Sequence, residues 1–318
     1  MHYRRLGRSG LKVSEISLGS WVTFGNQMDE KKASSLLHAA FEQGINYFDN
    51  ADVYADGLAE TIMGKAIKDL PRTELVISSK VFWPTGKGPN GRGLSRKHVM
   101  ESVHASLKRL GLDYLDLYFC HRFDPDTPIE EVVRTMNILI QQGKILYWGT
   151  SEWEASQVAR AYGVARQYNL IPPTMEQPQY NLLHRKRVED QLMPLVKELG
   201  IGLTTFSPLA YGILTGKYNE GIPEGSRATL ENYSWVRDRI TPERIERVRQ
   251  LAVIAEDLGI TPGQLAIAWI LRRKEVSSVI TGATRIEQLD ENLGAMEAQD
   301  KLSNDVLEKI DKAVEGMD

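Results

Sequence analysis

Residues 75–80 (LVISSK), 95–110 (SRKHVMESVHASLKRL) and 115–121 (LDLYFCH) contain the pattern that decides the fold of this 318-residue chain. The first and third stretches are short apolar runs of the length of buried strands. The middle stretch carries apolar side chains at three- and four-residue spacing, as a helix with one buried face does. Strand, helix and strand in this order predict a unit whose two strands are parallel and joined by a right-handed crossover.

The same alternation continues along the rest of the chain. The apolar runs expected to form strands are residues 16–18, 45–48, 75–79, 115–119, 145–148, 174–176, 202–205 and 278–280. The amphipathic segments expected to form helices lie near residues 29–43, 58–68, 95–110, 127–141, 153–167, 187–198, 241–258 and 286–297. Repeated strand and helix units predict an α/β fold with a parallel sheet.

A closed (β/α)8 barrel and an open doubly wound sheet can both use this pattern. An open sheet that binds a dinucleotide places a G-x-G-x-x-G turn after an early strand, and none follows the first predicted strand. We therefore expect a (β/α)8 TIM barrel, as one domain over residues 1–318, because no linker divides the chain. A hairpin over residues 3–13 is expected to plug the N-terminal end of the barrel, and residues 303–314 to form an extra C-terminal helix.

Capping residues mark several of the predicted helix starts. Ser95 precedes one helix, and the pairs Thr127-Pro128 and Thr241-Pro242 open two others. Two long loops, residues 82–93 and 208–240, depart from the strict repeat and are expected to form the rim of a site.

Composition excludes several functional classes. Lys and Arg total 39 against 42 Asp and Glu, and the net charge of −3 offers no basic surface for nucleic acid. With Cys120 as the single cysteine, no internal disulfide can form, and the expected location is the cytoplasm. The first residues lack a signal peptide and no window approaches 18 consecutive apolar residues, so neither export nor a membrane span is expected.

Polar side chains follow three of the predicted strands at their C-terminal ends, where the active sites of such barrels lie. Asp49 follows the second strand, Lys80 the third and His121 the fourth, and Tyr54 comes five positions after Asp49. We expect these four side chains to converge. Each has an ordinary explanation by itself, as a turn, packing or solvated residue, so their convergence is what indicates catalysis.

The four residue types suit the reduction of a carbonyl group, whose oxygen must gain a proton. A tyrosine is a weak donor at its ordinary pKa, and we expect the Lys80 ammonium to lower the pKa of Tyr54. Asp49 would hold the lysine and balance its charge. His121 could donate a hydrogen bond to the carbonyl oxygen and orient it. Trp21 and Trp83, in loops near strand ends, are expected to wall the substrate pocket together with Tyr54 and His121.

The segment 49–54 (DNADVY), followed by Lys80 and His121, resembles the signature of the aldo-keto reductases. The resemblance covers nearly the whole chain and continues through residues 149–151 (GTS), 176–177 (EQ), 206–210 (FSPLA), 216–218 (GKY), 282–285 (GATR) and 288–292 (QLDEN). Within the family, residues 21–25 (WVTFG) and 221–223 (GIP) look most like the branch that holds the voltage-gated potassium channel β-subunits and their bacterial and plant relatives.

The resemblance implies that the barrel binds NADP(H), with Tyr54 as proton donor, Asp49 and Lys80 as its partners and His121 at the carbonyl. It implies that the nicotinamide amide contacts Ser151 and Gln177, and that the pyrophosphate contacts Ser207, Leu209, Gly212, Lys217 and Arg227. It also implies that the 2′-phosphate contacts Thr284, Arg285 and Gln288, and that the adenine contacts Glu291 and Asn292. Ser20, Trp21, Gln27, Asp49, Phe206 and Gly282 complete the implied cofactor set, and Tyr211 is a weaker candidate.

The expected preference for NADP rests chiefly on Arg285. Residues 282–285 lie between the last predicted strand and a helix that begins near Ile286, where backbone N–H groups and the helix dipole favour a phosphate. The planar guanidinium of Arg285 suits the same ligand, although a solvated arginine in a first helical turn has the same sequence pattern.

Three further features of the sequence have ordinary explanations. The run His184 to Arg187 is typical of solvated charge, with an acidic partner as the alternative. Cys120 is typical of an inert buried thiol. Glu101 and His104 have the i, i+3 spacing of some metal ligands, but no second pair follows and no metal is expected.

Two functional hypotheses follow. The first is an NADPH-dependent reductase of aldehydes, with ketones as a further class, that forms a homo-oligomer. The second is a regulatory module, similar to a channel β-subunit, that senses nucleotide and docks on a membrane channel. The absence of an extended segment before the barrel, and His121 where the channel subunits typically carry asparagine, favour the enzyme.

Overall fold

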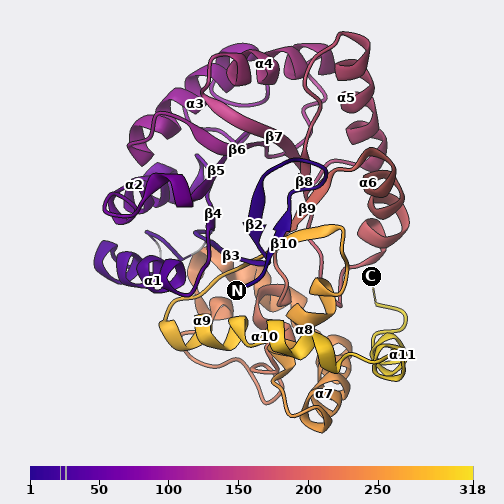
Figure 1. Ribbon diagram of the computed structural model, residues 1–318. Coiled ribbons are helices and arrows are strands. Elements are labelled where there is room, and N and C mark those ends of the chain that lie inside the picture. The colour runs from indigo at the N-terminus through magenta and orange to yellow at the C-terminus, as the bar shows by residue number, and fades with distance from the viewer. Residues whose placement is uncertain (22, 26, 318) are drawn as a thin grey trace.

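Within the described part of the computed structural model, residues 1–21, 23–25 and 27–317, eight parallel strands close into a barrel (Figure 1). In the order of the closed sheet the strands are β10 (Val276–Thr281), β3 (Ile16–Gly19), β4 (Tyr47–Asp49), β5 (Val76–Val81), β6 (Leu115–Cys120), β7 (Ile145–Ser151), β8 (Met175–Gln177) and β9 (Gly202–Thr205). Every predicted strand is confirmed, with ends that move by a few residues. Val22, within the 21–25 motif, lies outside the described residues.

Helices surround the barrel and connect its strands (Figure 1). They are α1 (Glu30–Glu42), α2 (Leu58–Ala66), α3 (Arg96–Leu110), α4 (Ile129–Gln141), α5 (Ala155–Gln167), α6 (Met193–Leu199), α7 (Pro242–Asp257), α8 (Pro262–Leu271), α9 (Ile286–Leu293), α10 (Ala295–Ala298) and α11 (Asn304–Ala313). A π-helical turn, Arg187–Leu192, precedes α6, and 3-10 turns occupy Tyr54–Gly57, Arg72–Glu74, Ala210–Thr215, Arg227–Thr229, Glu231–Arg239 and Gln299–Lys301. The predicted C-terminal helix is confirmed as α11, and the segment predicted at 286–297 divides into α9 and α10.

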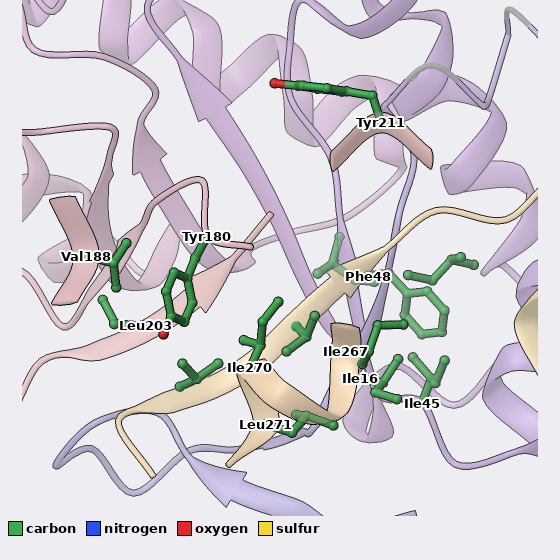
Figure 2. Close-up of a cluster of buried hydrophobic side chains, with 14 of the residues drawn as sticks. Ile16, Ile45, Phe48, Tyr180, Val188, Leu203, Tyr211, Ile267, Ile270 and Leu271 are labelled. Carbon is green, nitrogen blue, oxygen red and sulfur yellow. The ribbon is translucent and has the colours of Figure 1, made fainter. Parts of the chain in front are cut away.

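One helix, α8, was absent from the predicted set. Its residues from Leu265 to Leu271 are all buried, so the segment has no polar face and no helical periodicity for sequence reasoning to detect. Thr261 caps it by accepting the N–H of Gln264, whose side chain accepts the N–H of Thr261 in return. Figure 2 shows Ile267 and Ile270 of α8 in the same buried cluster as Ile16 of β3, and Trp269 is fully buried.

Two of the three predicted helix caps are confirmed. The hydroxyl of Ser95 accepts the N–H of His98, and that of Thr241 accepts the N–H of Arg244. The prediction for Thr127 was wrong, because α4 begins at Ile129 with Pro128 as its N-cap. The Thr127 hydroxyl instead donates to Asp124, a carboxylate that also accepts the backbone N–H of Leu94.

The N-terminal hairpin pairs β1 (Tyr3–Arg5) with β2 (Lys12–Ser14) in antiparallel register and lies across the ring of strands (Figure 1). It closes one end of the barrel, since Leu6 and Val13 are fully buried against interior side chains of the strands such as Tyr47 and Phe119. Arg4 fastens the hairpin, because its guanidinium donates to the backbone carbonyls of Leu271, Arg273 and Val276 and to the carboxylate of Glu15.

Among the described residues, no helix taken alone has both the length and the apolar content that crossing a membrane requires. The helices α7 and α8 have the required length and apolar content only when taken together, and they are bent by 87° at the break between them.

The turn of the hairpin gives a stability prediction. Gly7 has φ +55°, and a Cβ there would lie 2.4 Å from the carbonyl oxygen of Gly200. We expect Gly7→Ala to lower the free energy of unfolding by about 2 kcal/mol or more, from left-handed strain and backbone overlap. The matched control is Gly10→Ala in the same turn, where a Cβ meets nothing within 4 Å. Its effect should stay within about 0.5 kcal/mol in urea unfolding, and equal losses in the two variants would contradict the close packing of Gly7.

Candidate active site

The four predicted catalytic side chains come together at the C-terminal end of the barrel. Asp49 ends β4, Lys80 is near the end of β5, and His121 directly follows β6. The Lys80 ammonium lies 2.6 Å from Asp49 Oδ2, 2.7 Å from the carbonyl oxygen of Asn50 and 3.2 Å from the hydroxyl of Tyr54. Neighbouring parallel strands bring these ends together, and Lys80 is fully buried beneath the phenol.

Tyr54 reaches the lysine from a kinked 3-10 turn, Tyr54–Gly57. Ala55 and Asp56 within this turn have positive φ values of 48° and 53°, which cost energy in residues other than glycine. Backbone strain of this kind persists where the surroundings enforce it, and it is frequent at functional sites. The strained turn therefore fixes the phenol over Lys80.

The carboxylate of Asp49 accepts several further hydrogen bonds. Its Oδ1 accepts from the hydroxyls of Ser78 at 2.8 Å and Tyr47 at 3.1 Å, and from the amide of Gln177 at 3.0 Å. A buried charge costs several kcal/mol unless it is paired and hydrogen-bonded, and this carboxylate is both. The ion pair between Asp49 and Lys80 is thus a rigid and electrically balanced base for the site.

The expectation that the pKa of Tyr54 is lowered was wrong. Burial first, and then the negative charge of Asp49, raise the pKa of Tyr54 well above its usual value. The ammonium cannot act as an isolated positive charge because Asp49 compensates it at 2.6 Å. Tyr54 is therefore a protonated phenol over the physiological pH range, and the ammonium 3.2 Å away can stabilise negative charge on the phenol oxygen after its proton leaves.

His121 is a neutral imidazole beside this phenol. Burial first, and then the positive charges of Lys80 and Arg122, lower the pKa of His121 well below its usual value. Its ring centre lies 5.9 Å from that of Tyr54. Among the described residues none offers a hydrogen bond to its buried Nδ1. A neutral imidazole and a protonated phenol can both donate hydrogen bonds to one substrate oxygen.

Beyond the C-terminal end of β7, a network of hydrogen bonds surrounds Glu152, which follows this strand with φ +59°. Its carboxylate accepts the N–H of Gln179 at 2.7 Å and the guanidinium of Arg187 at 2.9 Å. The hydroxyl of Ser151 donates to the carbonyl oxygen of Gln177. The interpretation of the run His184 to Arg187 as solvated charge was wrong for Arg187, whose side chain is 16% exposed and pairs within the chain. The sequence could not show that the π-helical turn Arg187–Leu192 places this arginine beside Glu152.

These side chains open onto a cavity of about 1100 Å³. Of the predicted site residues, Trp21, Gln27, Asp49, Tyr54, Trp83, His121, Ser151, Gln177, Phe206, Ser207, Leu209, Gly212, Lys217, Arg227, Gly282, Thr284, Arg285, Gln288, Glu291 and Asn292 line it. Ser20 and Lys80 do not, because both are fully buried behind the lining. The two long loops contribute to the rim as expected, through Trp83 and through residues between 208 and 239.

Sequence reasoning missed several lining residues. Glu152 directly follows β7, and Arg122 lies two residues beyond the end of β6, so the strand-end criterion that found His121 could have included them. Tyr233, Trp235 and Arg239 come from a loop with no periodic signal, and nothing in the pattern identifies them.

The other end of the cavity gathers cations. Partial burial first, and then the charges of Arg227 and Arg285, lower the pKa of Lys217. Desolvation lowers the pKa of Arg227, which is half-buried beside Trp21. Arg285 is the N-cap of α9, where Gln288 accepts the N–H of Thr284 at 2.9 Å. Converging cations at a helix N-terminus fit the phosphates of a dinucleotide.

A run of left-handed residues follows β9 on the same side. Ser207, Ala210 and Tyr211 have φ between 46° and 62°, and Gly212 has φ 96°. A Cβ on Gly212 would lie 2.7 Å from the Lys217 ammonium nitrogen. Backbone strain in this loop brings main chain and lysine together beside the cavity, which suits close approach of a ligand.

Within residues 1–21, 23–25 and 27–317, no group of three or more His, Cys, Asp and Glu side chains is arranged to hold a metal. Cys120 is fully buried, and burial raises the pKa of its thiol.

Comparison with known proteins gives concordant matches over nearly the full length. A model of the aldo/keto reductase family matches residues 15–315. A protein of Arabidopsis thaliana described as "Probable voltage-gated potassium channel subunit beta" is 52% identical, over 99% of this chain and 97% of its own. A protein of Oryza sativa subsp. japonica with the same description is 51% identical over the same shares. A Schizosaccharomyces pombe protein, also described as a channel subunit beta, is 52% identical over 98% of this chain and 92% of its own.

The buried ion pair gives a second stability prediction. Lys80→Met leaves the Asp49 charge buried without its partner, and we expect it to lower the free energy of unfolding by about 3–5 kcal/mol. Combining it with Asp49→Asn should recover much of that loss in urea unfolding. The matched control is Lys65→Met, because the ammonium of Lys65 is also 2.6 Å from a carboxylate, Glu30, but both side chains are more than half exposed. That variant should change stability by about 0–1 kcal/mol, and similar losses at the two sites would count against the role of burial.

A pH prediction concerns Glu176, a buried carboxyl of β8. Burial raises the pKa of Glu176 to about 8, well above its value in an unfolded chain. Between these two pKa values the folded state holds a proton that the unfolded state has lost, so the stability due to this group falls as pH rises. Glu176→Gln should therefore gain stability relative to the wild type between pH 5 and pH 8, by roughly 1.4 kcal/mol per pH unit at most. Urea unfolding measures this, with Glu220→Gln, a 95% exposed side chain, as the control. A pH-independent difference for Glu176→Gln would exclude the raised pKa.

Proposed function

The chain belongs to the aldo/keto reductase family, and we propose that it is an NADPH-dependent oxidoreductase that reduces aldehydes, with ketones as a further class, to alcohols. The observation that carries the proposal is the protonated Tyr54 held 3.2 Å from the buried ammonium of Lys80 at the lining of a large cavity. In this proposal residues 1–318 act as a single domain.

The residues have separate roles in the proposed reaction. A bound nicotinamide cofactor supplies the hydride to the carbonyl carbon. Tyr54 donates its phenolic proton to the carbonyl oxygen, so that the product is a neutral alcohol and the phenol becomes a phenolate. The Lys80 ammonium stabilises that phenolate until a proton from solvent restores the phenol, and Asp49 holds the ammonium in place. His121 donates a hydrogen bond that orients the carbonyl oxygen.

The cofactor set divides into two ends in this proposal. Ser151 and Gln177, which meet on the β7–β8 edge beside Asp49, would bind the nicotinamide amide. The loop from residue 208 to 240 would cover the cofactor. The residues proposed to bind the pyrophosphate are Ser207, Leu209, Gly212, Lys217 and Arg227. Those proposed to bind the 2′-phosphate are Thr284, Arg285 and Gln288, and those proposed to bind the adenine are Glu291 and Asn292. The remaining members of the proposed cofactor set are Ser20, Trp21, Gln27, Phe206 and Gly282. The converging cations and the open N-terminus of α9 support this orientation.

The descriptions of the relatives favour a second candidate function. Proteins that share about half of their residues with this chain are described as channel β-subunits. A regulatory role would use the same nucleotide site without productive turnover and would add a docking surface for a membrane protein. The homo-oligomer and the cytoplasmic location stay predictions from the sequence for either function.

Replacement of the proposed proton donor tests the enzyme hypothesis. We expect Tyr54→Phe to lower kcat for NADPH-dependent reduction of small aldehydes, including methylglyoxal and an aromatic aldehyde, by about 10²–10⁴-fold. NADPH binding, followed by tryptophan fluorescence, should persist because Lys217, Arg227 and Arg285 are untouched. The matched control is Tyr168→Phe, an exposed tyrosine at the end of α5, which should behave as the wild type. NADH in place of NADPH measures the preference for the 2′-phosphate.

The outcomes separate the two candidate functions. Turnover that is lost in Tyr54→Phe alone supports the reductase. A wild-type protein that binds NADPH but reduces no aldehyde would exclude the reductase and favour the regulatory function.

A further inference from the structure

Neither the proposed reaction nor the cofactor set uses Arg122, a cation of the cavity. Arg122 follows His121 at the C-terminal end of β6 and lines the cavity. Its guanidinium donates a hydrogen bond to the backbone carbonyl of His121 and lies 5.6 Å from the ring centre of Trp83. Trp83 is 36% exposed, so this pair faces the open side of the cavity beside the imidazole. The guanidinium is therefore anchored by its neighbours and still accessible from the cavity.

The charges around the imidazole leave Arg122 uncompensated. Asp49 and Lys80 form a 2.6 Å ion pair, and Glu152 is paired with Arg187 at 2.9 Å. No carboxylate of a described residue lies within ion-pair distance of Arg122. Arg122 therefore brings a positive charge, without an ion-pair partner among the described residues, to the substrate end of the cavity.

This charge is separate from the cations assigned to the cofactor. In the closed barrel β6 lies four strands away from β10, the strand that leads to Arg285, so the two ends face each other across the ring. Arg227 and Arg285 lower the pKa of Lys217 after burial does, whereas Arg122 acts in the same way on His121. A dinucleotide whose phosphates occupy the first group of cations leaves Arg122 available to a second ligand.

We propose that the site selects carbonyl substrates that carry an anionic group, a carboxylate or a phosphate, and that Arg122 binds this group. The proposal rests on the proposed reductase function. A guanidinium forms paired hydrogen bonds with either anion and is always charged. Because Arg122 adjoins His121 in sequence, the anion would lie a few bonds from the carbonyl oxygen that His121 orients. Arg122 is thus a specificity-determining residue.

Pairs of charged and neutral substrates test this inference. The carboxylate pair is 4-carboxybenzaldehyde and 4-nitrobenzaldehyde, which differ in charge at one planar group. The phosphate pair is glyceraldehyde 3-phosphate and glyceraldehyde. In Arg122→Met we expect the ratio of kcat/KM, charged over neutral, to fall about tenfold or more, mainly through KM. Arg122→Lys should restore part of it because the charge returns without the planar fork. Arg134→Met, on the exposed face of α4, is the matched control and should leave both ratios unchanged.

A binding measurement keeps the test independent of turnover. Terephthalate titrated into the NADP⁺-loaded protein and into the free protein should change the tryptophan fluorescence, and Arg122→Met should weaken this binding about tenfold. A fall in the carboxylate ratio alone identifies carboxylates as the substrate class, and a fall in the phosphate ratio alone identifies phosphates. Unchanged ratios, or equal losses for charged and neutral substrates, would overturn the inference and leave the reductase intact. If the wild type reduces no aldehyde, the proposed function fails, and the titration decides whether Arg122 binds anions.

Discussion

The buried ion pair between Asp49 and Lys80 is the interaction on which the rest of the site depends. Two charges removed from water are costly, and they persist here because strand ends fixed by the barrel hold them 2.6 Å apart. The pair needs donors on every side of the carboxylate, and Ser78, Tyr47 and Gln177 supply them from three different strands. Closure of the barrel is therefore a condition for the site, since an open sheet would not bring β8 to face β4.

The plug at the other end of the barrel contributes to the same interaction. Tyr47 belongs to the interior cluster that includes Leu6 and Val13 of the hairpin, and its hydroxyl donates to Asp49. The Tyr47 side chain thus packs against the hairpin that closes the N-terminal end of the barrel and also contacts the carboxylate at the C-terminal end. Exclusion of water from the interior strengthens the attraction between Asp49 and Lys80, so the hairpin supports the electrostatics of a site that it does not touch.

Much of the fold could be predicted because its signals are local. Each strand is a short apolar run, and Asp49, Lys80 and His121 stand where such runs end, which is enough to place them together in a parallel barrel. The failures have a common physical origin in the environment of a residue. Helix α8 has no polar face because other elements cover it on all sides. The direction of the Tyr54 pKa shift depends first on burial and then on the charge of Asp49, and the limited exposure of Arg187 depends on how a π-helical turn orients it. These are properties of the three-dimensional arrangement, and no spacing in the sequence encodes them.

The way charge is balanced differs between the two ends of the cavity, and this difference has a chemical consequence. At the end proposed for the cofactor, Lys217 is repelled by Arg227 and Arg285, so an anion that enters would relieve this repulsion as well as form hydrogen bonds. At the catalytic end Lys80 cancels the charge of Asp49 at close range, so the carboxylate needed to hold the lysine does not repel an approaching anion. The neutral His121 adds no charge there, and the field that a substrate meets is then governed by Arg122. In the proposed function, this charge balance would let one cavity hold a polyanionic cofactor and still attract a carbonyl compound that carries an anionic group.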